Sequence, residues 1–154
     1  MKKKLFFLLD VDGVMTTGQF IYSQKGKVFK IFGPHDSDGL KLIKNLINIE
    51  FLTADRRGFV ISKKRISHDL GFKIHLVDEK KRMEFIKKKY GFRNTIYMGD
   101  GIFDSYILKK VKYGITPKNA RTEAKKNANF VTQSKSGEGA VLDASLHILK
   151  KFLK

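Results

Sequence analysis

Short apolar runs alternate with amphipathic segments along most of this 154-residue chain. The runs have the length and composition of buried strands, and the amphipathic segments carry apolar residues at helical spacing. This alternation predicts an α/β fold, a parallel sheet with helices on both faces. The expected strands are residues 5–10, 49–53, 74–77, 95–100, 113–116 and 129–132, and the expected helices are residues 37–47, 59–71, 79–91, 103–111, 119–128 and a last one from Ala140.

Residues 19–32, QFIYSQKGKVFKIF, interrupt the alternation. Two short alternating runs flank the turn residues QKGK, which predicts a projecting β-hairpin. Its apolar side chains, among them Phe20, Tyr22 and Phe29, would be costly as one exposed patch. We therefore expect neighbouring copies of the chain to cover them.

Length and composition limit the class of protein. A chain of 154 residues with 42% hydrophobic content predicts one domain, residues 1–154. The absence of cysteine excludes disulfides, zinc–thiolate sites and a cysteine nucleophile, and favours a reducing compartment. The first apolar run ends at Leu9, too early for a signal peptide, and no later run approaches the roughly 20 apolar residues that span a bilayer. We expect a cytoplasmic protein with no membrane contact.

The formal net charge is +17. Lysine clusters can bind nucleic acid by releasing phosphate counterions. Here the lysines fall on several predicted helix faces with few interleaved aromatic residues, which favours an ordinary solvated surface. A positive field would still raise encounter rates with anionic ligands.

Carboxylates follow two of the expected strands. Asp10 and Asp12 follow the first, Asp100 ends residues 95–100 with Asp104 just beyond, and Thr53 ends residues 49–53. Ligands of open α/β sheets bind at the carboxyl ends of strands. Several carboxylates in one crevice need a cation to offset their repulsion, and Mg²⁺ suits oxygen ligands.

The sequence DVDG has two simpler readings. A calcium-binding loop would need an oxygen ligand at Val14 and a glutamate at Ile21, so that reading fails. An acidic turn explains one such site, but less readily two at the ends of apolar strands. The spacing of Asp10 and Asp12 points both side chains the same way in an extended chain. One carboxylate can then attack phosphorus while the other protonates the leaving alcohol and activates water.

Four motifs in order resemble the haloacid dehalogenase superfamily: DVDGVMTTG, Thr53, a lysine within EKKRMEF, and GDGIFD. The hairpin, the phrase FGPHDSDGLKLIK, the absence of an inserted cap domain and the late GEGAV resemble its capless branch. That branch includes phosphatases of 3-deoxy-D-manno-octulosonate 8-phosphate and of nonulosonate (sialic-type) 9-phosphates. The resemblance implies a Rossmann-like fold, a Mg²⁺-dependent phosphatase acting in lipopolysaccharide or sialic acid biosynthesis, and a homotetramer in which neighbouring subunits cover each site.

The resemblance also implies residue roles. Asp10 would be the nucleophile and Asp12 the general acid/base, and Mg²⁺ would be bound by Asp10, Asp100 and the carbonyl of Asp12. Thr53 and a lysine would bind phosphate. Counting back from the apolar positions Met83, Phe85 and Ile86 favours Lys81 over Lys80. Asp104 would orient that lysine or support the metal ligands, or else act only as an acid at a helix N-terminus.

Two departures concern the substrate. The octulosonate phosphatases usually read Gly-Arg after the second-motif threonine, where this chain reads TADRRG, and they often have an arginine where it reads GEG. A nonulosonate 9-phosphate therefore becomes as plausible as the octulosonate. Arg57 and Arg65 are candidates for the substrate carboxylate, with solvated helix surface as their alternative.

Other assignments compete with a sugar phosphatase. The charge would suit a nucleic-acid end phosphatase, and the fold could serve a non-catalytic interaction module. The presence of Asp10, Asp12 and Asp100 favours activity. His35, Asp36 and Asp38 resemble a metal cluster, but we expect a structural or subunit-contact role for that loop.

Overall fold

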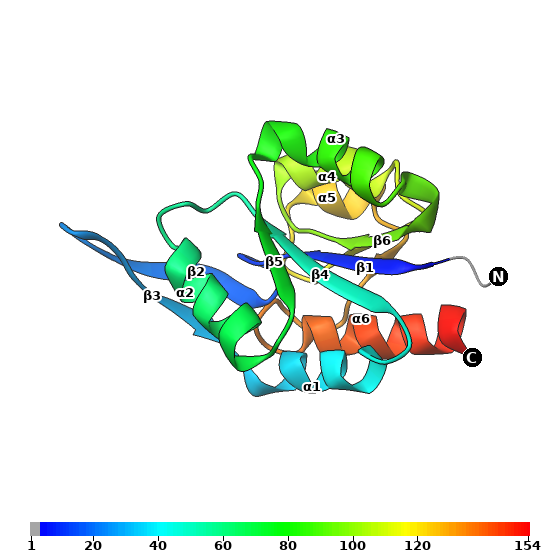
Figure 1. Ribbon diagram of the computed structural model, residues 1–154, viewed down its shortest axis with the longest axis horizontal. Helices are drawn as coiled ribbons and strands as arrows, with labels where there is room; N and C mark the ends of the chain where they lie inside the picture. The colour runs from blue at the N-terminus through cyan, green and yellow to red at the C-terminus, as the bar shows by residue number, and fades with distance from the viewer. Residues whose placement is uncertain (1–3) are drawn as a thin grey trace.

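A six-stranded parallel sheet forms the centre of the computed structural model, which describes residues 4–154 (Figure 1). The strand order is β5-β4-β1-β6-β7-β8. The bounds are β1 Phe6–Asp10, β4 Asn48–Thr53, β5 Lys73–Leu76, β6 Thr95–Met98, β7 Tyr113–Thr116 and β8 Phe130–Val131. Every neighbouring pair is parallel, which confirms the predicted fold class.

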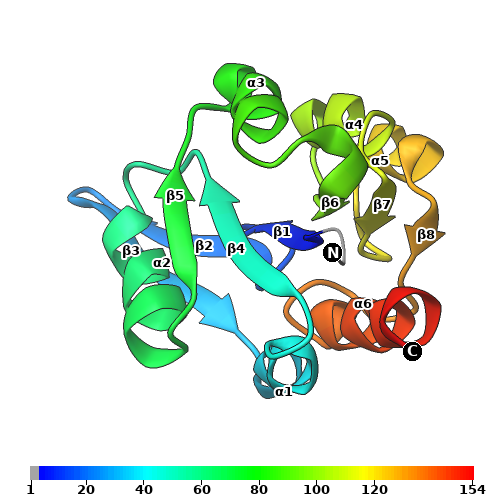
Figure 2. The ribbon, with the colours of Figure 1, turned by 45° about the vertical axis from the view of Figure 1, so that its right-hand side comes forward.

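Helices cover both faces of the sheet (Figure 2). On one face lie α1 (Pro34–Ile43) and α6 (Ala140–Ile148), with α6 continuing into the π-helical turn Leu149–Leu153. On the other lie α3 (Glu79–Lys89), α4 (Ile102–Leu108) and α5 (Thr122–Asn127). Between β4 and β5, α2 (Phe59–Lys63) continues into a second π-helical turn, Lys64–Asp69. A short 3₁₀ turn, Phe92–Asn94, precedes β6. None of these helices is long and apolar enough to cross a membrane.

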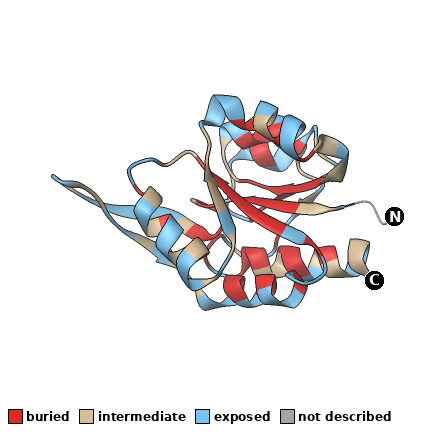
Figure 3. Cartoon of the chain, viewed as in Figure 1, coloured by how far each residue is buried: buried red, intermediate tan, exposed pale blue. Residues whose placement is uncertain are grey.

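The sheet separates two apolar cores because successive side chains of a strand point to opposite faces. In β1, Phe7 and Leu9 pack in the core under α1 and α6, and Leu8 packs in the core under α3 and α4. All three side chains are fully buried, as are most inward positions of the central strands (Figure 3). A strand buried on both faces reads as one continuous apolar run, as FFLL does.

The hairpin projects from the sheet as an antiparallel pair, β2 (Thr16–Ser23) and β3 (Gly26–Phe32) (Figure 1). Phe20 pairs with Lys30, and Ile21 with Phe29. Six apolar side chains of the hairpin are more than a third exposed: Phe20, Ile21, Tyr22, Val28, Phe29 and Ile31. No inserted cap domain occurs within residues 4–154, so the hairpin is the main projection beside the sheet.

Asp36 fixes the start of α6 from a distant part of the chain. Its fully buried carboxylate accepts hydrogen bonds from the backbone N–H of Val141 (2.8 Å) and of Gly139 (3.4 Å). Burial raises the pKa of Asp36, and these backbone hydrogen bonds oppose the rise. His35 and Asp38 on the same turn are exposed, and these three residues form no metal-binding group in the described chain. Asp36 therefore has a structural role, connecting α1 to α6.

The contact between α1 and α6 explains why α1 begins earlier than expected. Pro34 occupies the first turn, where its missing N–H costs nothing and its fixed φ suits a helix. Gly39 faces α6 so closely that a Cβ there would lie 2.6 Å from the Cα of Leu142. The sequence predicted a start near Ser37, whereas the structure begins the helix at Pro34.

Replacing Asp36 should therefore destabilise the fold. We expect Asp36→Ala to lower the free energy of unfolding by about 1–3 kcal/mol, because it leaves buried N–H groups at the start of α6 without an acceptor. Urea denaturation followed by circular dichroism measures the change. Asp38→Ala, at an exposed position two residues away, should change it by less than about 0.5 kcal/mol. Equal losses in the two variants would contradict the capping role.

Candidate active site

An open cavity of about 520 Å³ lies at the carboxyl ends of β1, β4 and β6. This is the edge where α/β sheets bind ligands. Its acidic lining residues are Asp10, Asp12, Asp55, Asp78, Glu79, Asp100 and Asp104, and its basic ones are Lys27, Arg56, Arg57 and Arg82. Phe103 and Ile102 supply an apolar rim.

Three carboxylates gather on one side of the cavity. Asp10 ends β1, Asp100 follows β6 and Asp104 lies in the first turn of α4. One oxygen from each lies within 4.8 Å of the others. Burial, opposed by Arg82 and reinforced by Asp104 and Asp100, raises the pKa of Asp10 well above its usual value. Burial and the charge of Asp104 raise the pKa of Asp100 to about 7.

This arrangement fits a hard divalent cation. Oxygen ligands are what Mg²⁺ prefers, and a cation would offset both the burial and the mutual repulsion that raise the pKa values of Asp10 and Asp100. Asp104 is the least available of the three, because its oxygens already accept hydrogen bonds from four donors: the backbone N–H groups of Asp100 and Gly101, the Tyr97 hydroxyl and Arg82. It therefore organises the loop around Asp100.

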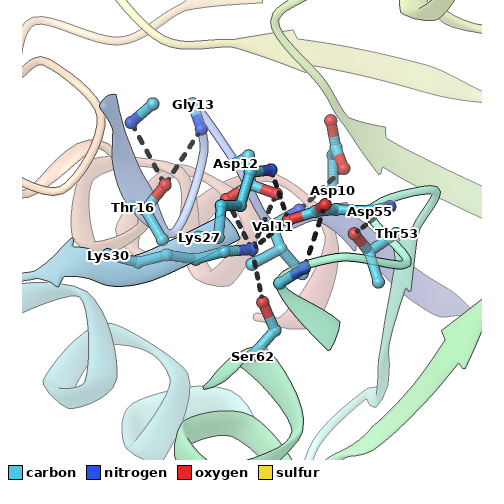
Figure 4. Close-up of polar contacts among 12 residues, drawn as sticks. Asp10, Val11, Asp12, Gly13, Thr16, Lys27, Lys30, Thr53, Asp55 and Ser62 are labelled. Carbon is cyan, nitrogen blue, oxygen red and sulfur yellow. Dashed lines mark hydrogen bonds and ion pairs between the residues drawn. The ribbon is translucent and has the colours of Figure 1, made fainter. Parts of the chain in front are cut away.

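The loop after β1 depends on glycine. Gly13 has φ +80°, and a Cβ there would lie 2.0 Å from an oxygen of Asp100. Thr16 holds the loop by accepting hydrogen bonds from the N–H groups of Gly13 (3.2 Å) and Gly18 (3.1 Å) (Figure 4). The glycine and threonine of DVDGVMTTG thus let the loop approach the acidic group.

Arg82 supplies the buried cation of the site. It is 5% exposed, and its Nη1 lies 3.2 Å from Asp104 Oδ1, 3.1 Å from the Tyr97 hydroxyl and 3.5 Å from Asp10 Oδ1. Burial disfavours its charge, but the potentials of Tyr97, Asp10 and Asp104 raise its pKa overall. Its Nε has no hydrogen-bond partner within residues 4–154. Arg82 also lines the cavity, which places its guanidinium group beside Asp10 where an anion would bind.

The structure does not bring the expected lysines to this position. Lys80 and Lys81 are exposed and do not line the cavity, whereas Arg82, the next residue, does. Asp78 caps α3 by accepting a hydrogen bond from the Lys80 N–H, which sets the phase of the helix. The inward positions are then Arg82 and Ile86, four residues apart. Counting back four from the apolar Ile86 would have identified Arg82.

Thr53 lies where expected. It ends β4, is 1% exposed and lines the cavity. Its hydroxyl accepts a hydrogen bond from the Asp55 N–H (3.2 Å), and Leu52 beside it pairs with Asp10 across the sheet.

Two hairpin lysines reach the site, a contact that the sequence did not reveal. Lys30 Nζ lies 2.9 Å from Asp12 Oδ1, 2.8 Å from Asp55 Oδ2 and 2.8 Å from Ser62 Oγ (Figure 4). Lys27 Nζ lies 2.7 Å from the same oxygen of Asp55. Burial alone would raise the pKa of Asp55, but hydrogen bonds from Lys27 and Lys30 lower it to about 2. No pattern in residues 26–32 distinguishes these lysines from solvated ones.

The two arginines proposed for the substrate lie in different places. Arg57 lines the cavity together with Arg56, and both are exposed. Neither makes an ion pair with any residue in the described part of the chain. Arg65 follows α2 on the π-helical turn and does not line the cavity.

Comparison with known proteins gives a consistent group of relatives. The family of haloacid dehalogenase-like hydrolases matches residues 77–144. The 3-deoxy-D-manno-octulosonate 8-phosphate phosphatase KdsC of Haemophilus influenzae is 30% identical, over 97% of this chain and 87% of that protein.

Two solved structures are similar over nearly the whole chain. The cobalt-bound deoxy-D-mannose-octulosonate 8-phosphate phosphatase of Haemophilus influenzae has a TM-score of 0.81 at 25% identity, covering 96% of this chain and 88% of that one. The Moraxella catarrhalis 3-deoxy-D-manno-octulosonate 8-phosphate phosphatase, in complex with a magnesium ion, a phosphate ion and KDO, has a TM-score of 0.79 at 27% identity, covering 97% and 87%.

The raised pKa of Asp100 predicts how the protein without a divalent cation responds to pH. A carboxyl with a pKa of about 7 in the folded protein and 3.8 in the unfolded chain binds more protons when folded. Its contribution to stability should be fully present below about pH 4 and lost as the pH rises toward about 7. Urea denaturation in EDTA should show this loss in the wild type and a smaller loss in Asp100→Asn. If the free energy of unfolding depended on pH in the same way in the wild type and in Asp100→Asn, the raised pKa of Asp100 would be contradicted.

Mg²⁺ should reverse that loss. A cation that binds only the folded state raises the free energy of unfolding by about 2.7 kcal/mol when its concentration is about 100 times its dissociation constant. We expect a gain of this order for the wild type near pH 8 and none for Asp100→Asn, measured by the same denaturation.

Proposed function

Because this chain belongs to the haloacid dehalogenase-like hydrolases, we propose that its cavity hydrolyses the phosphomonoester of a small acidic sugar, with Mg²⁺, through an aspartyl-phosphate. The chain is a phosphomonoesterase of that family, as its named relatives are. The observation that carries the proposal is the grouping of Asp10, Asp100 and Asp104 around the guanidinium of Arg82 at the end of β1.

In the first step, a carboxylate oxygen of Asp10 attacks phosphorus and the bond from phosphorus to the sugar oxygen breaks. Asp12, two residues on, gives its proton to that leaving oxygen. In the second step, Asp12 takes a proton from water, the water oxygen attacks the phosphorus of the aspartyl-phosphate, and inorganic phosphate leaves. Asp10 is then a free carboxylate again.

The phosphoryl oxygens need positive and polar partners throughout. Uncatalysed hydrolysis of phosphomonoesters is slow enough to require accelerations of up to about 10²¹, and general acid catalysis supplies only about 10²–10⁴. Electrostatic stabilisation must supply most of the remainder. Arg82, beside Asp10 and with an unpaired Nε, and Thr53 are the residues we assign to this task, Arg82 in place of the lysine expected from the sequence.

The donor set fits Mg²⁺. Asp10 and Asp100, with the carbonyl of Asp12 as the third ligand, would hold it, and the bound cation would neutralise charge on the phosphoryl group. Asp104 would keep Asp100 in place through the backbone N–H groups of Asp100 and Gly101. The carboxylate of Asp12 forms an ion pair with Lys30. This pairing keeps Asp12 apart from the other three carboxylates, Asp10, Asp100 and Asp104.

An acidic substrate suits the mouth of the cavity. Arg56 and Arg57 line it without ion pairs to any residue between 4 and 154, and a guanidinium binds a carboxylate through paired hydrogen bonds. Asp55 is neutralised by Lys27 and Lys30, so it does not repel such a group. The relatives named above act on 3-deoxy-D-manno-octulosonate 8-phosphate. We keep this substrate and a nonulosonate 9-phosphate as alternatives, because TADRRG departs from the octulosonate pattern.

The exposed hairpin supports a homotetramer. Six of its apolar side chains are exposed and its Lys27 lines the open site, so burying the hairpin against neighbouring copies would also restrict water at that site. The cytoplasmic location expected from the cysteine-free sequence stays a prediction.

Phosphate release tests the proposed function. The panel contains 3-deoxy-D-manno-octulosonate 8-phosphate, nonulosonate 9-phosphates, hexose phosphates and a 3′-phosphorylated oligonucleotide, each with and without Mg²⁺. We expect one sugar-acid phosphate to dominate, Asp10→Asn to reduce turnover to background, and Asp38→Asn on the exposed side of α1 to retain it. Dominant release from the oligonucleotide, or full activity of Asp10→Asn, would overturn the proposal.

The tetramer has a separate test. Phe29→Lys places a charge on the most exposed aromatic residue of the hairpin and should dissociate an assembly of four 17.7 kDa chains in sedimentation velocity. Leu42→Lys, at an equally apolar exposed position on α1, is the matched control and should leave the mass unchanged. A wild type that sediments as a monomer would exclude this assembly.

A further inference from the structure

Lys30 is a buried cation beside the cavity that pairs with the proposed general acid, Asp12. The Lys30 side chain is 0% exposed, unlike most lysines of this chain, and it does not line the cavity as Lys27 does. A buried ammonium group is costly unless its donors are all paired. The Lys30 ammonium group is compensated by two ion pairs, with Asp12 and Asp55, and it donates hydrogen bonds to Asp12 and Ser62.

The three partners come from three separate segments. Asp12 lies in the loop after β1, Asp55 in the loop after β4 and Ser62 in α2. Lys30 reaches them from β3, where it pairs with Phe20 (Figure 4). Gly58 leaves the space for this arrangement, since a Cβ there would lie 2.6 Å from Lys30 Cε and 2.3 Å from Asp55 Oδ2. The ammonium group is therefore held by the tertiary structure.

Lys30 contacts both oxygens of Asp12, at 2.9 Å and 3.0 Å. Asp12 needs such a partner, because its side chain is 28% exposed at the start of the turn after β1 and is otherwise free to rotate. Proton transfer to a leaving group requires the acid within hydrogen-bond reach in a defined orientation, and small displacements cost large factors in rate.

We propose that Lys30 is a positioning residue that holds the Asp12 carboxyl group in the orientation from which it protonates the leaving alcohol. The inference rests on the proposed function, since it takes Asp12 as the general acid. Lys30 touches no substrate, because it is outside the cavity lining. Asp55 and Ser62 anchor it, and the hairpin that carries it therefore contributes to catalysis from within the same subunit.

The dependence on the leaving group tests this role. Single-turnover release of the alcohol reports the first step alone, measured with the best sugar phosphate of the panel and with 4-nitrophenyl phosphate, whose leaving group needs little protonation. We expect Lys30→Met to slow release of the sugar alcohol at least about 10-fold more than release of 4-nitrophenol. This difference is part of the rate factor of roughly 10²–10⁴ that general acid catalysis contributes. KM should change little. Equal losses on both substrates, or a loss confined to KM, would overturn the proposal.

Two further variants separate positioning from general disruption. Lys27→Met removes the same charge from the same strand and also loses a contact with Asp55, but not with Asp12, so its effect should not depend on the leaving group. In an Asp12→Asn background, Lys30→Met should cost much less than in the wild type, because the group that it positions is already gone. Additive losses would overturn the proposal. If Lys30→Met fails to fold, Lys30→Met with Asp55→Asn removes both charges and repeats the comparison.

A structural measurement keeps the inference separate from the proposed function. A crystal structure of Lys30→Met should show the Asp12 carboxyl group rotated away from its wild-type orientation, and an unmoved Asp12 would refute the positioning role whatever the activity. A wild type that releases no phosphate from any substrate would instead refute the function, with the orientation of Asp12 still decided by the structure.

Discussion

Repulsion among carboxylates at the ends of β1 and β6 is the constraint around which this site is built. Two full charges about 5 Å apart repel by roughly 3 kcal/mol at an effective dielectric constant of about 20, a large share of the 5–15 kcal/mol that stabilises a typical domain. Burial, together with this repulsion, raises the pKa values of Asp10 and Asp100. Arg82 offsets part of the charge from inside the protein, and the remaining imbalance is what a divalent cation would correct.

The residues around Asp10, Asp100 and Asp104 allow these three carboxyl groups to lie close together. Gly13 lets the loop after β1 lie against Asp100 without a Cβ, and Asp104 uses its oxygens on backbone donors, Tyr97 and Arg82. Asp12 lies outside this group of carboxylates and forms an ion pair with Lys30. Asp10, Asp100 and Asp104 thus form one group, and Asp12 lies apart from them. In the proposed mechanism the first group holds the cation and Asp12 is the general acid.

The hairpin contributes two sets of side chains. Phe20, Ile21 and Phe29 are exposed, whereas Lys27 and Lys30 form ion pairs with Asp55. An element that looks from its sequence like a surface for other copies of the chain is also part of the site of its own chain. Contacts on the exposed side could therefore influence catalysis through the position of Lys30.

Much of the fold was predictable because it depends on local patterns. The apolar runs identified all six strands of the sheet, and the hairpin follows from its turn residues. The expected start of α1 at residue 37 was about three residues late, because Pro34 occupies the first turn of the helix. The expectation that Lys81 binds phosphate came from the resemblance, whereas the helical spacing of α3 puts Arg82 and Ile86, not Lys81, on the inward face.

The sequence by itself determined the sheet, its two cores and the carboxylates at one edge, since these follow from side-chain periodicity and from residues next in the chain to strand ends. Only the tertiary structure decided which cations meet those carboxylates. Lys30 lies 18 residues from Asp12 and 32 from Ser62 along the chain, and Arg82 lies 22 from Asp104. Long flexible side chains carry no periodic signal for such contacts, because their partners are set by how the hairpin, α2 and α3 pack on the sheet.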